Sequence, residues 1–221
     1  MIRAVLFDFD GTLANTLPFY VKAYDQALQK LGFKWDERKI VQNCFGKKEI
    51  DICKALGLPE KTQEFTNSYF SAVKELFKQA QLFSDTLETL EFIKNKGLKI
   101  VIITFAYRWY IDQMIKQYNL DNYLDLVIST DDVDKAKPDP EAVLEAVKIL
   151  KIKPDAVLVV GDSKSDILMG NSAGSKTVLF FIKEYELFYN FKEIKKASPT
   201  FIINNLTKLK EIINKKYQIY E

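Results

Sequence analysis

The chain has 221 residues, of which 48% are hydrophobic and 28% are charged. This length and composition suffice for one sizeable hydrophobic core with a smaller second domain. The 32 basic and 30 acidic residues leave a net charge of +2, which favours neither nucleic acid nor a membrane surface as the main partner. No apolar run approaches the roughly 18 residues that a membrane span needs.

The counts of cysteine and histidine narrow the chemistry. Two cysteines are too few for a disulfide framework, and the chain enters its first predicted strand at once, so we expect a cytoplasmic protein without a signal peptide. The absence of histidine excludes Ser-His-Asp and Cys-His catalysis and histidine-ligated zinc. Any general acid or base must therefore be Asp, Glu, Lys, Tyr or Cys.

The first predicted strand, near residues 5–7, runs directly into two carboxylates, Asp8 and Asp10, before Gly11. A short and continuously apolar strand is typical of a parallel sheet that is buried on both faces. Ligands of such a sheet bind beyond the carboxyl ends of the strands, where these two aspartates would emerge. Because the carboxylates repel each other unless a cation or a shared proton lies between them, the stretch predicts a magnesium site.

Residues 15–83 are predicted to form a helical insertion. Apolar residues recur at helical spacing over 19–31, 40–44, 49–56 and 61–80. No convincing strand pattern falls between residues 36 and 82. We therefore expect a helical domain over 15–83, inserted into a core formed by residues 1–14 and 84–221.

From residue 84 onward, helical and strand patterns alternate. The expected helices span 86–96, 109–118, 141–150 and 167–173, with one more at the C-terminus. The expected strands span 99–103, 124–129, 156–160, 177–182 and 200–203. This alternation implies right-handed crossovers, so the predicted fold is α/β, with a Rossmann-like, doubly wound parallel sheet.

Polar residues follow several of these strands, at the edge where such a sheet gathers its active site. They are Asp8 with Asp10, Thr104, Lys137, and Asp162 with Asp166. Their order and spacing resemble the haloacid dehalogenase superfamily, in its phosphatase branch. Residues 8–13 (DFDGTL), Thr104, Lys137 and residues 161–166 (GDSKSD) resemble the first to fourth motifs of that family. The helical insertion resembles the α-helical cap of its phosphoglycolate phosphatase-like and β-phosphoglucomutase-like members.

The resemblance implies a magnesium-dependent phosphatase that hydrolyses a small phosphomonoester through an aspartyl-phosphate. Asp8 would be the nucleophile, and Asp10 would first protonate the leaving oxygen and then deprotonate the attacking water. The Thr104 hydroxyl, with backbone N–H groups at Phe105, would hold the phosphoryl oxygens. Lys137 would offset the negative charge of nucleophile and phosphate together.

The resemblance also implies the ligands of Mg²⁺. They would come from Asp8, the carbonyl of Asp10, and Asp162, together with substrate and water. Asp166 would orient a water ligand or Lys137. The partner would be a small phosphorylated metabolite, with no nucleic acid or membrane involved, and the chain would be a monomer or a homodimer.

Several motifs have a second interpretation. Asp8 and Asp10 before Gly11 could form a turn, Lys135 competes with Lys137, and Asp162 or Asp166 could cap the following helix. Residues 170–177 are one substitution from a phosphate-binding P-loop, yet they are predicted to close a helix and open a strand, the reverse of a P-loop.

The chain also departs from the family pattern. Asn15 stands where the family often has an acid, and Phe105 stands where it often has Ser or Asn. Lys47, next to Lys48 in the insertion, is a candidate substrate contact, although exposed surface lysines explain the pattern as well. The functional alternatives are a phosphomutase of the same superfamily and a catalytically idle binding protein on this fold.

Overall fold

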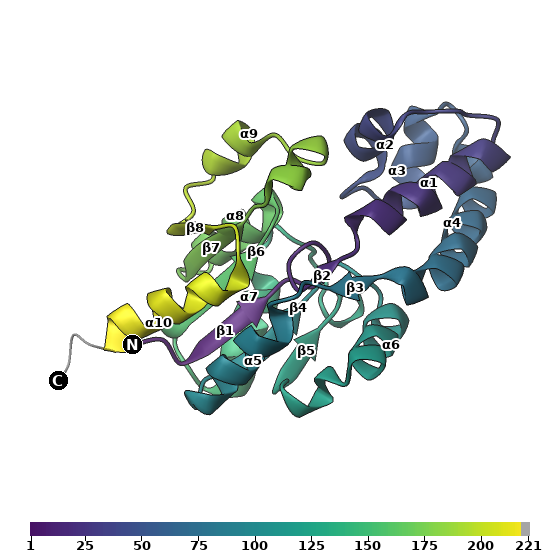
Figure 1. Cartoon of the computed structure of the whole chain (residues 1–221). Coiled ribbons are helices and arrows are strands. Elements are labelled where there is room, and N and C mark those ends of the chain that lie inside the picture. Colours follow the sequence, from purple (N-terminus) through teal and green to yellow (C-terminus); the bar gives the residue numbers. More distant parts are fainter. Residues whose placement is uncertain (218–221) are drawn as a thin grey trace. The chain divides into compact units, whose positions relative to one another are not determined.

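The computed structural model describes residues 1–217 of the chain. It divides into two compact units (Figure 1), one formed by Met1–Ala14 with Leu82–Glu221 and the other by Asn15–Gln81. Within residues 1–217, no helix combines the length and the apolar character that crossing a membrane requires.

The larger unit is built on a six-stranded sheet in the order β5-β4-β1-β6-β7-β8, with every neighbouring pair parallel. The strands are β1 (Ala4–Phe7), β4 (Lys99–Ile103), β5 (Leu126–Ile128), β6 (Val157–Gly161), β7 (Lys176–Phe180) and β8 (Phe201–Ile203). Two short strands, β2 (Ala14–Asn15) and β3 (Gln81–Leu82), pair separately and were not expected from the sequence. The predicted α/β fold with a parallel sheet is confirmed.

The centre of this sheet is β1, and its register decides which residues meet at the edge. All four of its residues are buried, as expected of a strand covered on both faces. Phe7 pairs with Ile102 of β4 on one side and with Val160 of β6 on the other. Because the three strands run parallel, the residues that follow each of them leave the sheet at one edge.

Helices cover both faces of the sheet. One face packs against α7 (Glu141–Leu150) and α8 (Lys164–Ser172). The buried residues of this cluster include Leu6, Val101, Val159, Val143 and Met169. On the opposite face lie α5 (Thr86–Asn95) and α10 (Leu209–Tyr217), as Figure 1 shows. The crossover from β4 to β5 is α6 (Arg108–Tyr118).

Two helices of this unit differ from the sequence-based expectation. The predicted helix over 167–173 begins earlier, because the side chain of Ser163 accepts from the backbone N–H of Asp166 and caps α8 at Lys164. The short helix α9 (Phe191–Lys195) was not expected, and the side chain of Asn190 caps it by accepting from the N–H groups of Lys192 and Glu193.

The smaller unit is helical. It contains α1 (Leu17–Lys30), α2 (Glu37–Cys44), α3 (Glu49–Ala55) and α4 (Thr62–Leu76). Stacked aromatic rings join α1 to α4, with the ring centroids of Tyr24 and Tyr69 4.4 Å apart and Phe65 fully buried beside them. The long helix predicted over 61–80 ends at Leu76 and continues as a 3-10 turn over Phe77–Gln79.

Candidate active site

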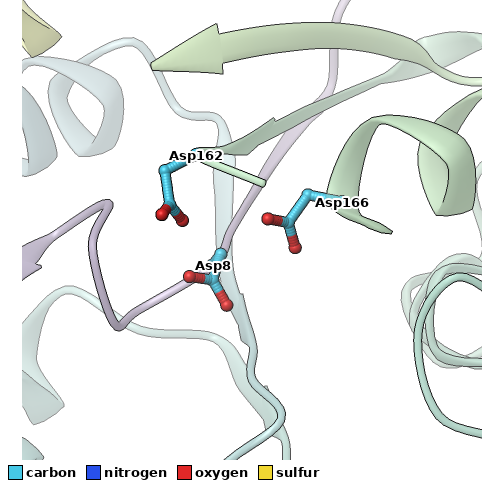
Figure 2. Close-up of side chains that lie close together, drawn as sticks. All are labelled: Asp8, Asp162 and Asp166. Atoms are coloured by element: carbon cyan, nitrogen blue, oxygen red, sulfur yellow. The ribbon is translucent and has the colours of Figure 1, made fainter. Parts of the chain in front are cut away.

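Three buried carboxylates meet at the carboxyl edge of the central strands. Figure 2 shows the side chains of Asp8, Asp162 and Asp166 pointing toward one another. Each offers one oxygen, and these oxygens all lie within 4.8 Å of one another. Asp8 follows β1, Asp162 follows β6, and Asp166 lies in the first turn of α8. Residues separated by more than 150 positions in the sequence therefore form one anionic cluster.

Lys137 neutralises part of this cluster. Its ammonium nitrogen lies 2.6 Å from Oδ1 of Asp8 and 2.7 Å from Oδ1 of Asp166, and its side chain is only 7% exposed. Burial alone would lower the pKa of Lys137, but the carboxylates of Asp166 and Asp8 outweigh it and raise that pKa above its ordinary value. The lysine therefore stays charged. Its competitor Lys135 is 70% exposed and lies 3.8 Å from Asp139.

Both carboxylate oxygens of Asp166 accept hydrogen bonds. Oδ1 accepts from Lys137, and Oδ2 accepts from the backbone N–H of Ser163 at 3.1 Å and from its hydroxyl at 2.6 Å. The approach is close, since a Cβ on Gly161 would lie 2.3 Å from the Cβ of Asp166. Asp166 thus caps α8 and holds Lys137 at the same time.

Asp162 has one oxygen without a hydrogen-bond donor. Oδ1 accepts from the Thr12 hydroxyl at 3.1 Å, whereas Oδ2 is buried and accepts from no donor in the part of the chain that the structure describes. The Tyr189 hydroxyl approaches closely enough to lower the pKa of this carboxyl in part, but without hydrogen-bond geometry to Oδ2. Gly11, at φ +88°, packs against Oδ2 so closely that a Cβ there would lie 2.5 Å away.

The electrostatics of the cluster favour a cation. Burial raises the pKa of Asp8 to about 7, against the opposing effect of Lys137. Burial, together with the charges of Asp8 and Asp166, also raises the pKa of Asp162. When ionised, three carboxylates and one ammonium carry a net charge of −2. A hard divalent cation fits this donor set, because it would neutralise that charge and supply a partner for the unpaired oxygen.

Two other predicted site residues, Asp10 and Thr104, follow β1 and β4 at this edge but lie outside the cluster. Thr104 follows β4 and is buried, and its hydroxyl oxygen accepts from the N–H of Ala106 at 3.0 Å, which orders the turn at Phe105. Oδ1 of Asp10 accepts from the hydroxyl of Tyr110 at 2.9 Å. Lys47 belongs to the smaller unit, where its ammonium donates to the carbonyl of Gln42 at 3.3 Å.

Three residues at this edge were not anticipated as site residues: Thr12, Tyr110 and Tyr185. The Tyr110 hydroxyl donates to Asp10, which lies 100 positions earlier in the sequence. The Tyr185 hydroxyl donates to the carbonyl of Gly11 at 2.5 Å, although the two residues are 174 positions apart in the sequence. No local pattern marks such tyrosines, because apolar spacing explains them equally well as core residues. The sequence analysis included Thr12 only as one residue of the first motif, without a role of its own.

Known proteins provide an independent comparison. The family model for haloacid dehalogenase-like hydrolases matches residues 5–180. Pyrophosphatase PpaX of Anoxybacillus flavithermus is 32% identical over 218 residues, covering 96% of this chain and 97% of that protein. Pyrophosphatase PpaX of Halalkalibacterium halodurans is 28% identical, covering 97% and 98% of the two chains. A haloacid dehalogenase-like family hydrolase from Streptococcus pneumoniae has the same fold, with a TM-score of 0.82 at 20% identity over 96% of this chain and 98% of that one.

The family match and the similarity to pyrophosphatases over nearly the whole chain show a hydrolase of the phosphatase type. The chain belongs to the haloacid dehalogenase-like hydrolase family.

Proposed function

We propose that this protein is a magnesium-dependent phosphatase that hydrolyses a small phosphomonoester through a phosphorylated Asp8. The observation that carries the proposal is the Asp8 carboxylate, which is buried, is paired with Lys137 and lies in one cluster with the carboxylate of Asp162. A carboxylate needs no deprotonation by a base once it is ionised, which suits a chain without histidine.

The first half-reaction transfers the phosphoryl group to the protein. An oxygen of Asp8 attacks phosphorus while the bond from phosphorus to the leaving oxygen breaks, and Asp10 gives its proton to that oxygen. Lys137 stabilises the added negative charge, since its ammonium already contacts Asp8. Thr104 and the N–H groups of the turn that follows it hold the phosphoryl oxygens.

The second half-reaction returns Asp8 to its starting state. Asp10, now ionised, takes a proton from water as that water attacks phosphorus, and the bond to Asp8 breaks. Asp8, Asp162 and the carbonyl of Asp10 would hold Mg²⁺, while Asp166 keeps Lys137 in place. When bound, Mg²⁺ would stabilise negative charge on the phosphoryl oxygens.

The helical unit Asn15–Gln81 is our candidate for the part of the chain that selects the substrate. In enzymes with such an inserted unit, closure excludes water from the reaction and completes the site. Lys47 remains a candidate contact for an anionic substrate within this proposal.

Inorganic pyrophosphate is a second candidate substrate, because the relatives at 28–32% identity are named pyrophosphatases. A panel of phosphorylated metabolites with Mg²⁺, including phosphoglycolate, sugar phosphates, nucleotides and pyrophosphate, separates these substrates by phosphate release. Phosphomutase activity would instead appear as isomerisation of a sugar phosphate without release.

The decisive variant is Asp8→Asn, assayed with an aryl phosphate and Mg²⁺. We expect turnover to be abolished while the unfolding transition is retained. Undiminished turnover would contradict the proposed mechanism. Absence of both phosphate release and sugar-phosphate isomerisation by the wild type across the whole panel would favour a binding protein on this fold.

A further inference from the structure

We propose that Tyr110 is a positioning residue, which holds the Asp10 carboxyl in the orientation from which it transfers a proton to the leaving oxygen. The Tyr110 hydroxyl donates to Oδ1 of Asp10 at 2.9 Å. This bond strengthens as the Asp10 carboxyl gives up its proton, because hydrogen bonds to an ionised acceptor are stronger and their geometry is better defined. This inference rests on the proposed function, because it concerns the acid of that reaction.

The tyrosine is held rigidly. Its side chain is 2% exposed and is one of the largest fully buried side chains in the described residues, so its ring has little freedom to turn. It lies in the first turn of α6, where its backbone N–H donates to the carbonyl of Tyr107 at 3.0 Å. The hydroxyl is therefore aimed by the helix rather than by a flexible segment.

A second set of contacts fixes the start of that helix. The backbone N–H of Arg108 donates to Asp131 at 2.6 Å, and its guanidinium contacts both Asp132 and the carbonyl of Val127. The carbonyl of Ala106 accepts from the N–H of Thr130 at 3.2 Å. Together these bonds tie the first turn of α6 to the chain that follows β5.

The backbone around Asp10 is anchored separately. The N–H of Gly11 donates to the carbonyl of Ala14 at 2.8 Å, and the carbonyl of Gly11 accepts from the Tyr185 hydroxyl at 2.5 Å. Tyr110→Phe therefore removes one hydrogen bond to the Asp10 side chain and leaves the hydrogen bonds that anchor the loop intact. Because the loop and the Asp10 side chain are held by different hydrogen bonds, a substitution that removes only the hydroxyl oxygen of Tyr110 can test its role.

The test is Tyr110→Phe, assayed with two classes of ester. An alkyl leaving group needs a proton as its bond to phosphorus breaks, whereas p-nitrophenolate leaves without one. We compare kcat/KM for two substrates: p-nitrophenyl phosphate and the alkyl phosphate that the wild type hydrolyses fastest. The ratio of the alkyl value to the p-nitrophenyl value thus reports on proton delivery alone. We expect this ratio to fall roughly 10-fold in Tyr110→Phe, the effect of losing one hydrogen bond to a charged group.

Two further variants calibrate the result. Asp10→Asn removes the acid itself and should lower the same ratio by about 10²-fold or more. Tyr123→Phe removes the hydroxyl of a half-buried tyrosine that lies under the ammonium of Lys94, and it should leave the ratio unchanged. The thermal unfolding midpoint of each variant is measured alongside.

The outcomes are distinguishable. An equal loss with both esters, or no loss with either, would overturn the role of Tyr110 while leaving the phosphatase proposal intact. A wild type that hydrolyses neither class of ester would overturn the proposed function, and the role of Tyr110 with it.

Discussion

Lys137 places a positive charge between two buried carboxylates, those of Asp8 and Asp166. Pairs of this kind gain little net stability over apolar packing, but removing one partner leaves an uncompensated buried charge. The contact is therefore expected to be important for folding as well as for charge neutralisation during phosphoryl transfer.

Replacing Lys137 by Met tests this dependence. Without the ammonium, we expect the free energy of unfolding at neutral pH to fall by about 3 to 5 kcal/mol, measured by urea denaturation in the absence of metal. Phosphatase turnover should be lost as well. Lys135→Met is the matched control, since Lys135 is 70% exposed and should alter neither quantity. Equal effects of the two substitutions would contradict the assignment.

The first turn of α8 joins helix stability to the site, because one aspartate serves both. Ser163 and Asp166 form a reciprocal capping box, and the remaining oxygen of Asp166 holds Lys137. A cap of this type contributes about 1 kcal/mol. Disturbing the helix start should therefore disturb the position of the lysine.

Ser163→Ala and Asn190→Ala separate these two consequences. Both remove a helix cap, of α8 and α9 respectively, and both should lower the free energy of unfolding by about 1 kcal/mol. Only Ser163→Ala should also reduce turnover, because only that cap includes a residue bonded to Lys137. A similar loss of turnover in Asn190→Ala would count against the link between α8 and the site.

Cys44, the last residue of α2, allows a pH-dependent test of packing in the helical unit. It is fully buried, and burial raises the pKa of its thiol from 9.0 to about 12 although Lys47 opposes the rise. Since the unfolded thiol ionises first, the stability linked to this group is complete below pH 9 and falls as the pH rises toward 12.

The same shift predicts how Cys44 reacts. At pH 8.5, alkylation of Cys44 by iodoacetamide in the native protein should be slow, and it should become fast in concentrated urea, because the thiolate is the reactive form. Peptide mass spectrometry gives the rate at this cysteine directly. Fast modification of the native protein would show that the thiol is accessible or ionised, contrary to the structure.

At the scale of the whole molecule, the parallel sheet explains why the sequence could predict that the candidate site residues lie close together. A continuous apolar strand followed by Asp8, and another followed by Asp162, were enough to predict that these residues leave one edge. The strand pattern did not predict which side chains form hydrogen bonds with one another. The contacts of Tyr110 with Asp10 and of Tyr185 with Gly11 depend on packing between distant elements, for which apolar spacing carries no signal.

Metal binding should be visible in the stability of the whole chain. A ligand that binds only the folded state raises the free energy of unfolding, by about 2.7 kcal/mol at one hundred times its Kd. We expect Mg²⁺ to raise the unfolding midpoint of the wild type and of Asp155→Asn, an exposed control, but not that of Asp162→Asn. Equal stabilisation of all three proteins would place the metal elsewhere.

If the phosphoryl group passes through Asp8, the phosphorylated aspartate can be trapped and identified. The wild type, mixed with substrate and Mg²⁺ and quenched in acid, is digested and analysed for a phosphoryl group on the peptide that contains Asp8. We expect a phosphorylated Asp8 that forms within the first turnover and is absent in Asp8→Asn. Steady hydrolysis with no phosphorylated peptide, or with the phosphoryl group on another residue, would contradict it.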